Sequence, residues 1–472
     1  MGWFLDKIRG LAGIGGAAEE YVSIQPARGF ETAALEKTVW YRGQPGELAQ
    51  FYSQTDDWAG NTSFWAASAR SGSKVRRIHS GLPALIADTL AGIAASDFLG
   101  VTVDRAQDIW DEIARENNFA GLIKKAARAA LVVGDGAFKL SYDGAVSRFP
   151  IIEFFGGDRT RYEYSRGRLE SVVFTTEYER GGKRWRLHER YRRGGVDYRL
   201  ADESGREVPL SSLEETASLR PVVNEEGFMM AFPLIFDESA AYPGRGKSVY
   251  EGKLGAFDAL DETLSQWVDA LRDGRVVTYI PSNMLPRDPA TGEALRPDGF
   301  SRRYAETDAD LSEGGGHITV AQPEIKTDAL FSTYANFLDI ALTGVIAPAT
   351  LGIDVKKLDN AEAQREKEKA TLYTRGRIVS ALSAVLPEVA DAALRMYSAI
   401  NGADERGRFA AAARFGEYQN PSFEAQIEAV GKAVSGGIMS VRTAVSELYG
   451  STWTAEMKEE EIARLESDTN LR

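Results

Sequence analysis

The residue types that most often carry enzyme chemistry are scarce and scattered in this chain. It has no cysteine, so thiolate nucleophiles, thiolate metal sites and disulfides are excluded. The three histidines, His79, His188 and His317, lie far apart in the sequence and form no zinc-binding spacing such as HExxH. We therefore expect surface or strand histidines rather than metal ligands or catalytic bases.

Other short motifs that could do chemistry are incomplete. Ser71 and Lys74 have the SxxK spacing of a lysine-activated serine, but the motifs that accompany it in such hydrolases are missing. The glycine-rich stretches 13–16 and 134–136 complete neither a GxGxxG nor a P-loop pattern. Paired aspartates at 56–57 and at 308 and 310 could hold a hard cation, although such pairs are commonly only solvated. We expect no enzymatic activity, no cofactor and no metal.

Acidic residues dominate the charge of the chain, with a formal net charge of −13. Affinity for DNA comes mostly from Lys and Arg that neutralise phosphates, so the chain is not a simple nucleic-acid binder. Basic residues gather at 159–168, at 180–193 and around Lys356, and we expect most of them on solvated strands and loops. No window of about 18 uncharged apolar residues is present, which predicts the absence of a membrane-spanning helix.

The longest helical patterns flank a turn-rich insert in the middle of the chain. In 247–272 and again in 327–346, apolar residues recur every three or four positions. At 1.5 Å per residue these helices would be roughly 40 Å and 30 Å long. A hairpin of this length is expected to bury its apolar stripe against neighbouring elements or other copies of the chain, which indicates part of an assembly. The stripe residues that we expect to pack are Leu254, Phe257, Leu260, Leu264, Trp267, Leu271, Phe337 and Leu338.

The segments around the hairpin predict an α+β fold. Helical patterns occupy 31–53, 82–95 and 104–133. From Gly134 the apolar period changes to two, and Gly-rich turns predict an antiparallel meander to about residue 200. The insert opens and closes with a strand, which favours a small α/β or β module. A break containing Pro348 precedes a long helix with an expected kink at Pro387, and two more helices are expected in the C-terminal segment.

This order of segments resembles that of the portal proteins of tailed double-stranded DNA phages, of the siphovirus type. The resemblance extends from about Ala33 to Leu465 and depends on segment order and patterning. The stretches that carry it are YRGQ at 41–44, the helix at 86–94, LVVGDGAFKL at 131–140, GKS at 246–248 and NAEA at 360–363. The segment after Asn420 is short for this family.

The resemblance implies a ring, usually of twelve subunits, at one capsid vertex of a virion that is assembled in the host cytoplasm. Double-stranded DNA would be packaged and ejected through the ring. The implied partners are copies of the chain itself, DNA bound without sequence specificity, the terminase large subunit, a head–tail adaptor, and the major capsid and scaffolding proteins, with no membrane. The implied parts are a flexible N-terminal segment (1–30), a wing (31–246), a stem helix (247–272), a clip (273–326), a second stem helix (327–344), a tunnel loop (345–359), a long kinked helix with the wing return (360–419) and a crown (420–472).

A channel in which DNA slides should repel phosphates rather than hold them. Five carboxylates of the two stem helices are candidates for an acidic channel wall, with intersubunit salt bridges or the outer surface as alternatives: Asp258, Asp261, Glu262, Asp269 and Asp339. In the tunnel loop, Asp354, Lys356 and Lys357 are candidates for contact with DNA, the two lysines through transient phosphate contacts. The alternative function is a homo-oligomeric head–tail adaptor or scaffold that never contacts DNA, and a third hypothesis is a hydrolase that uses Ser71 and Lys74.

Overall fold

The chain forms two compact units, Met1–Phe415 and Gly416–Arg472, in the computed structural model. The structure describes residues 28–55, 63–66, 76–281, 284, 287–293, 303–307, 318–353, 361–402, 407–416, 423–449 and 453–469. The larger unit combines helices with mostly antiparallel sheets, which confirms the α+β class. None of the described helices has the length and the apolar character that crossing a membrane requires.

The first helices of the larger unit pack around α7 (Phe119–Val133). Helix α2 (Phe30–Arg42) ends before Gly43, whose φ of 65° reverses the chain, and α3 (Pro45–Gln54) begins with a proline in its first turn. Helices α5 (Leu82–Ser96) and α6 (Gln107–Glu116) follow. Alanines on one side of α7 are fully buried, which allows its neighbours to approach closely.

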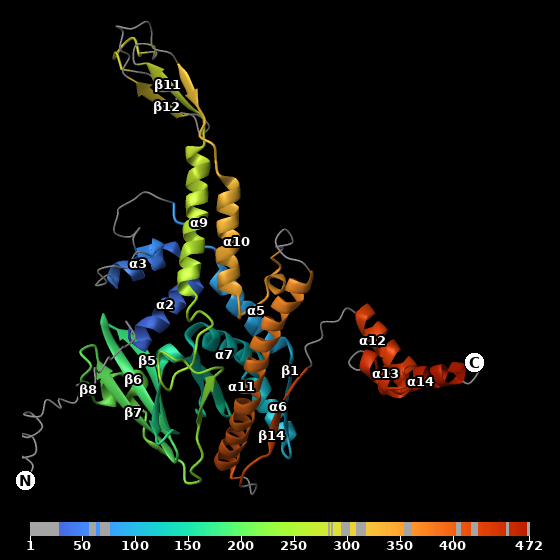
Figure 1. Cartoon of the computed structure of the whole chain (residues 1–472). Helices are drawn as coiled ribbons and strands as arrows, with labels where there is room; N and C mark the ends of the chain where they lie inside the picture. Colours follow the sequence, from blue (N-terminus) through green and yellow to red (C-terminus); the bar gives the residue numbers. More distant parts are fainter. Residues whose placement is uncertain are drawn as a thin grey trace, which may run out of the picture. The chain divides into compact units, whose positions relative to one another are not determined.

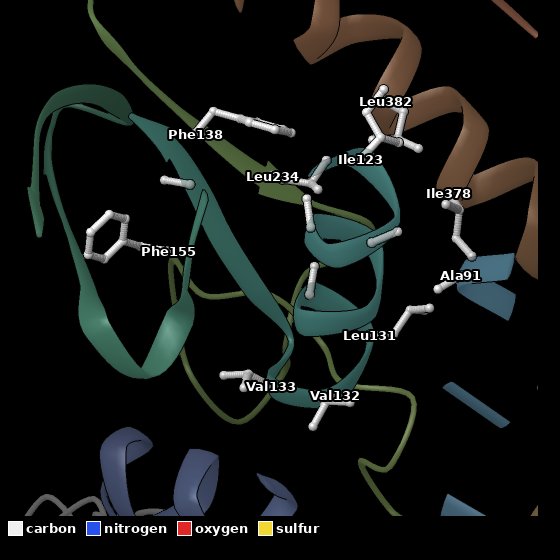
Figure 2. Close-up of a cluster of buried hydrophobic side chains, with 14 of the residues drawn as sticks. Ala91, Ile123, Leu131, Val132, Val133, Phe138, Phe155, Leu234, Ile378 and Leu382 are labelled. Carbon is white, nitrogen blue, oxygen red and sulfur yellow. The ribbon is translucent and has the colours of Figure 1, made fainter. Parts of the chain in front are cut away.

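A three-stranded antiparallel sheet covers another side of α7. Strand β2 (Asp135–Ser141) lies between β3 (Ile151–Gly156) and β10 (Ala231–Ile235). Figure 2 shows Phe138 of β2 and Leu234 of β10 near Ile123 of α7, with two side chains of α11 on the other side of that helix. The prediction that β2 belongs to the meander is therefore wrong, because β2 lies in this separate sheet.

The meander itself is present as a second antiparallel sheet. Its strands are β4 (Thr160–Ser165), β5 (Arg168–Arg180), β6 (Lys183–Arg192), β7 (Gly195–Asp202) and β8 (Glu207–Val208), paired in that order, with β9 (Val222–Val223) also on β7. Short helical turns are η1 (Gly157–Arg159), η2 (Leu210–Ser212) and α8 (Glu214–Ala217). Most arginines of the predicted basic clusters are exposed on these strands and turns, as expected.

Two helices form a hairpin, and the segment that joins them in the sequence forms a further small sheet. Helices α9 (Leu254–Asp273) and α10 (Thr327–Leu342) lie side by side (Figure 1). Strand β11 (Val277–Pro281) pairs in parallel with β12 (Arg303–Thr307) and antiparallel with β13 (Thr319–Ala321). The sequence pattern predicted β11 and β13 but gave no signal for β12.

The predicted start of the first long helix is wrong. Helix α9 begins at Leu254 rather than at Lys247, because the preceding residues are held on the C-terminal end of α7. The Ser248 hydroxyl donates to the Val132 carbonyl at 2.6 Å, and the Val249 N–H donates to the Leu131 carbonyl at 3.0 Å. These bonds satisfy α7 carbonyls that no helical partner can reach.

Among the remaining elements of the larger unit, its last strand pairs with a strand from much earlier in the chain. Helix α11 (Ala361–Asn401) runs through Pro387, after the short turn η4 (Pro348–Leu351). Strand β14 (Ala411–Phe415) then pairs antiparallel with β1 (Phe98–Val103), which the sequence did not predict. The described residues of the second unit form three helices, α12 (Phe423–Ser435), α13 (Val441–Tyr449) and α14 (Ala455–Thr469), where two were expected.

Candidate stem and channel surface

The α9–α10 hairpin is buried at one end only. Every buried residue of α9 lies between Phe257 and Ser265, and none of residues 266–273 is buried. On α10 the buried residues lie between Ala335 and Leu342. The hairpin therefore has a base half, packed on the rest of the unit, and a distal half that leads to the β11–β13 sheet (Figure 1).

The predicted stripe residues follow this division. Phe257, Leu260 and Leu338 are buried at the base. Leu254, Leu264, Trp267 and Phe337 are half-buried. Leu271, in the distal half, is 51% exposed, so it does not pack within a single chain, and its packing against another copy stays a prediction.

Further large apolar side chains are exposed on the hairpin and on its sheet. Phe331 and Ile340 of α10 are 43% and 53% exposed, and Ile318 and Val320 beside β11 are also exposed. Burying one such side chain is worth about 1.5–3 kcal/mol. Several of them along one hairpin make a surface that a partner would stabilise by covering it.

Two of the five carboxylates expected on a channel wall are inside the chain, which corrects that expectation for them. Asp258 is 8% exposed and Asp261 is fully buried. Their oxygens accept hydrogen bonds from the backbone N–H groups of Phe64, Trp65 and Ser80, which lie far away in the sequence. A carboxylate with these internal partners cannot also face a channel.

Asp258 and Asp261 form one polar cluster with Ser265, which we call the anchor cluster. Asp258 accepts the N–H of Phe64 at 2.7 Å and that of Trp65 at 3.1 Å. Asp261 accepts the N–H of Ser80 at 2.8 Å and the indole N–H of Trp65 at 3.1 Å.

Two further bonds complete the anchor cluster. The Ser265 hydroxyl oxygen accepts the N–H of Ile78 at 3.0 Å. The imidazole Nδ1 of His79 lies 2.7 Å from an Asp261 oxygen and donates to it. His79 is buried, so the expectation of a surface or strand histidine is wrong there, while His188 does lie on strand β6.

The protonation of Asp258 is shifted by its surroundings. Burial raises the pKa of its carboxyl to about 6, because removal from water penalises the charged form. The backbone N–H groups of Phe64 and Trp65 oppose this shift by stabilising the carboxylate. The nearby charges of Asp261 and Glu262 add to the increase.

The other three carboxylates expected on the channel wall are half-buried or exposed on the hairpin. Glu262 is half-buried and accepts from the Gln266 side chain at 2.9 Å. Asp269 is half-buried and lies 3.2 Å from Arg272, the one basic residue within the two helices. Asp339 is exposed, as are Asp273 and Asp328, which the sequence analysis did not single out.

Two stretches that carry the resemblance meet at the base of the hairpin. Gly134 and Gly246 are in such close contact that a Cβ atom on Gly246 would lie 2.1 Å from the Gly134 carbonyl oxygen. Arg245 donates to both oxygens of Asp135, at 2.9 Å and 2.7 Å. The Gly246 N–H donates to the same carboxylate at 2.7 Å. The sequence showed these stretches but not their contact, and it gave no reason to single out Arg245.

Lys253 connects the two helices of the hairpin. Its ammonium group donates to the Ile340 carbonyl at 2.7 Å and to the Thr343 carbonyl at 2.9 Å. A cation at the C-terminal end of a helix is favoured by the helix dipole. Burial lowers the pKa of this lysine, and the carboxylate of Asp339 opposes that shift.

The first residues of the predicted tunnel loop (345–359) are held on α11. The Ala347 N–H donates to the Thr371 hydroxyl at 2.8 Å, and the Thr374 hydroxyl donates to the Val345 carbonyl at 2.7 Å. The candidate DNA-contacting residues themselves, Asp354, Lys356 and Lys357, lie outside the described residues. Ser71, Lys74, His317 and the acidic pairs at 56–57 and at 308 and 310 lie outside them too.

Within the described ranges, no group of three or more histidine, aspartate or glutamate side chains could hold a metal ion. Cavities are also present there. One of about 230 Å³ lies beside the hairpin base and is lined by residues that include Lys247, Lys253 and Arg377. Arg377 is paired with Asp237 at 2.9 Å, and Lys253 donates to the carbonyls of Ile340 and Thr343, so these two cations are already engaged within the chain.

Comparison with known proteins gives matches only among solved structures. No protein-family model matches the sequence, and no curated protein matches it. The chain is similar to a chain in the structure described as "Virion of native gene transfer agent (GTA) particle", with a TM-score of 0.42, 14% identity, and coverage of 93% of this chain and 98% of that one.

Two further structures are similar. One is "Neck of native GTA particle computed with C12 symmetry", with a TM-score of 0.41, 14% identity, and coverage of 93% of this chain and 98% of that one. The other is "Neck of empty GTA particle computed with C6 symmetry", with a TM-score of 0.39, 13% identity, and coverage of 81% of this chain and 97% of that one.

Proposed function

We propose that this chain is the subunit of a portal ring, which forms a channel for double-stranded DNA at one vertex of a phage-like capsid. In this proposal α9 and α10 form the stem of the ring. The β11–β13 sheet is the clip, where a terminase motor and later a head–tail adaptor bind. The chain supplies no chemistry of its own, and the motor is a separate ATPase.

The observation that carries the proposal is the exposure of large apolar side chains in the distal half of the hairpin. Leu271 and Phe331 are exposed there, although a single chain would gain stability by covering them. A second copy of the chain is a natural cover, because contacts between different faces of identical copies close into a ring when the rotation between neighbours permits it. Copies of a helical hairpin arranged in this way surround an axial hole.

The charge of the hairpin supports DNA as the occupant of that hole. Carboxylates outnumber the single basic residue on the two helices, even after Asp258 and Asp261 are assigned to the interior. Like charge between wall and phosphates prevents tight binding, and at physiological ionic strength this repulsion acts over about 8 Å. The remaining candidates for the wall are Glu262, Asp269 and Asp339.

Cryo-electron microscopy of the purified protein, together with its mass in solution, tests the proposal. We expect a ring with an axial hole that admits B-form DNA, with the hairpins around the hole. A stable monomer, or a ring too narrow for duplex DNA, would contradict the portal function. A ring whose hole is lined by other elements would favour a scaffold or adaptor without DNA contact.

A further inference from the structure

The anchor cluster lies at the last buried position of α9. Beyond Ser265, no residue of this helix is buried by the rest of the chain. The cluster is therefore the final attachment of α9 before its distal half. Any change in the direction of α9 that starts here is carried along the whole distal half.

The contacts of the cluster are directional in a way that apolar packing is not. Asp258, Asp261 and Ser265 accept four backbone N–H groups, from residues 64, 65, 78 and 80. Hydrogen bonds weaken steeply as their angles depart from linear, so several converging bonds restrict the rotation and tilt of the helix. The two aspartates are three residues apart and so lie on the same helix face.

Burying two carboxylates at this place has a cost that packing alone would not require. A buried charge is unfavourable unless hydrogen bonds compensate it, and an apolar pair would fill the same space without that cost. Here every oxygen of both aspartates has a described donor. The arrangement exchanges some stability for a defined geometry.

His79 extends the cluster to α2. Its Nδ1 donates to Asp261, and its ring lies 5.5 Å from the ring of Trp40. Gly43 leaves the room that this imidazole needs, because a Cβ atom there would lie 2.6 Å from its Cδ2. The Nε2 of His79 is buried and has no hydrogen-bond partner among the described residues.

We propose that Asp258, Asp261 and Ser265 are positioning residues that set the direction of the distal half of α9. This inference rests on the proposed portal function, in which neighbouring hairpins must meet at the same angle around the ring. With a rise of 1.5 Å per residue, a tilt of about 10° at Ser265 moves the end of α9 by about 2 Å. Close-packed interfaces do not tolerate such a shift, so the number of subunits that closes the ring depends on this angle.

The test compares two single variants with a matched control. Ser265→Ala removes the acceptor of the Ile78 N–H, and Asp258→Asn places an amide donor against the N–H of Phe64 or Trp65. The control is Asp273→Asn, at an exposed position on the same helix and outside the cluster. The first measurement is hydrogen exchange of the backbone amides in residues 64–65 and 78–80, with the amides of α7 as the internal reference.

We expect exchange in these two short segments to become at least about tenfold faster in each variant, with α7 unchanged and with the control like the wild type. The second measurement is the distribution of subunit numbers by cryo-electron microscopy, which should broaden in the variants and stay sharp in the control. Here Ser265→Ala provides a variant that keeps both carboxylates, in case Asp258→Asn does not fold.

Two outcomes would overturn the inference. Unchanged exchange in Ser265→Ala would show that the cluster does not hold residues 78–80. Faster exchange with an unaltered subunit distribution would show that the cluster holds the chain but does not set the ring. If the wild type forms no ring, the portal function fails, whereas the exchange result still reports on the attachment itself.

Discussion

At the scale of single residues, the carboxyl of Asp258 departs clearly from the ordinary behaviour of its type. Its folded-state pKa is raised to about 6, so the folded chain binds the proton more tightly than the unfolded chain does. The stability linked to this proton is fully present below the unfolded pKa of about 4 and is lost as the pH rises through 6. This contribution to stability therefore changes mainly between about pH 4 and about pH 6.

Asp258→Asn should remove this dependence on pH. Between pH 4 and pH 7, the wild type should lose up to about 3 kcal/mol of unfolding free energy more than the variant does. Urea unfolding at several pH values measures this difference, with Asp273→Asn as the control, because it removes a carboxyl from the same helix at an exposed position that does not shift the pKa of Asp258. Parallel pH profiles of wild type and Asp258→Asn would refute it.

At this scale, the prediction from sequence was wrong for side chains whose partners lie far away in the chain. Aspartates at 258 and 261 on an amphipathic helix are most simply interpreted as solvent-facing, and the pattern of α9 supports that interpretation. Their partners include the backbone N–H groups of Phe64, Trp65 and Ser80, and backbone groups leave no trace in residue types. The buried His79 side chain has Asp261 as its partner, and nothing in the sequence shows that these two distant residues meet.

At the scale of elements, prediction succeeded where the signal is local. Helices α2 and α3 lie in the stretch around 31–53 that has a helical pattern, and the meander strands β5–β7 depend on glycine turns between alternating strands. It failed where the partner is remote. The pairing of β2 with β10 and of β1 with β14 joins distant segments, and a period of two indicates a strand but not its neighbour.

A substitution in the distal half of the hairpin tests whether copies of the chain contact one another there. Leu271→Asp should leave the free energy of unfolding of a dissociated chain within about 0.5 kcal/mol, because the side chain is already half in water. The same change should abolish ring formation, because it would place a charge in a contact between copies. Light scattering after size-exclusion chromatography measures the assembly.

The control for Leu271→Asp is Val146→Asp, which makes the same kind of change at a 72% exposed position in the turn after β2. Rings that form equally well with Asp at 271 would show that this face stays in water. Loss of assembly in both variants would point to a general effect of added negative charge instead.

At the scale of the whole molecule, the negative net charge and the proposed channel act together. Neutralising the wall through Glu262→Gln, Asp269→Asn and Asp339→Asn should raise the affinity of the ring for short duplex DNA by at least about tenfold, because repulsion is removed from every subunit at once. The affinity should also fall more steeply with salt. Fluorescence anisotropy of labelled duplex over a salt series measures both.

The matched control changes the net charge equally at exposed positions away from the hairpin, through Glu170→Gln, Glu179→Gln and Glu203→Gln. If both triple variants gain affinity to the same extent, the effect comes from overall charge. The location of the wall would then be wrong, although the ring could still be correct.

The contact between Gly134 and Gly246 also limits how this protein can vary. Any side chain at Gly246 would collide with the carbonyl of Gly134, and a side chain at Gly134 would collide with the Gly246 carbonyl in turn. Neither residue can therefore be exchanged alone without separating β2 from the turn that precedes α9. Related chains that keep this turn should retain glycine at both places, however far the rest of their sequences diverge.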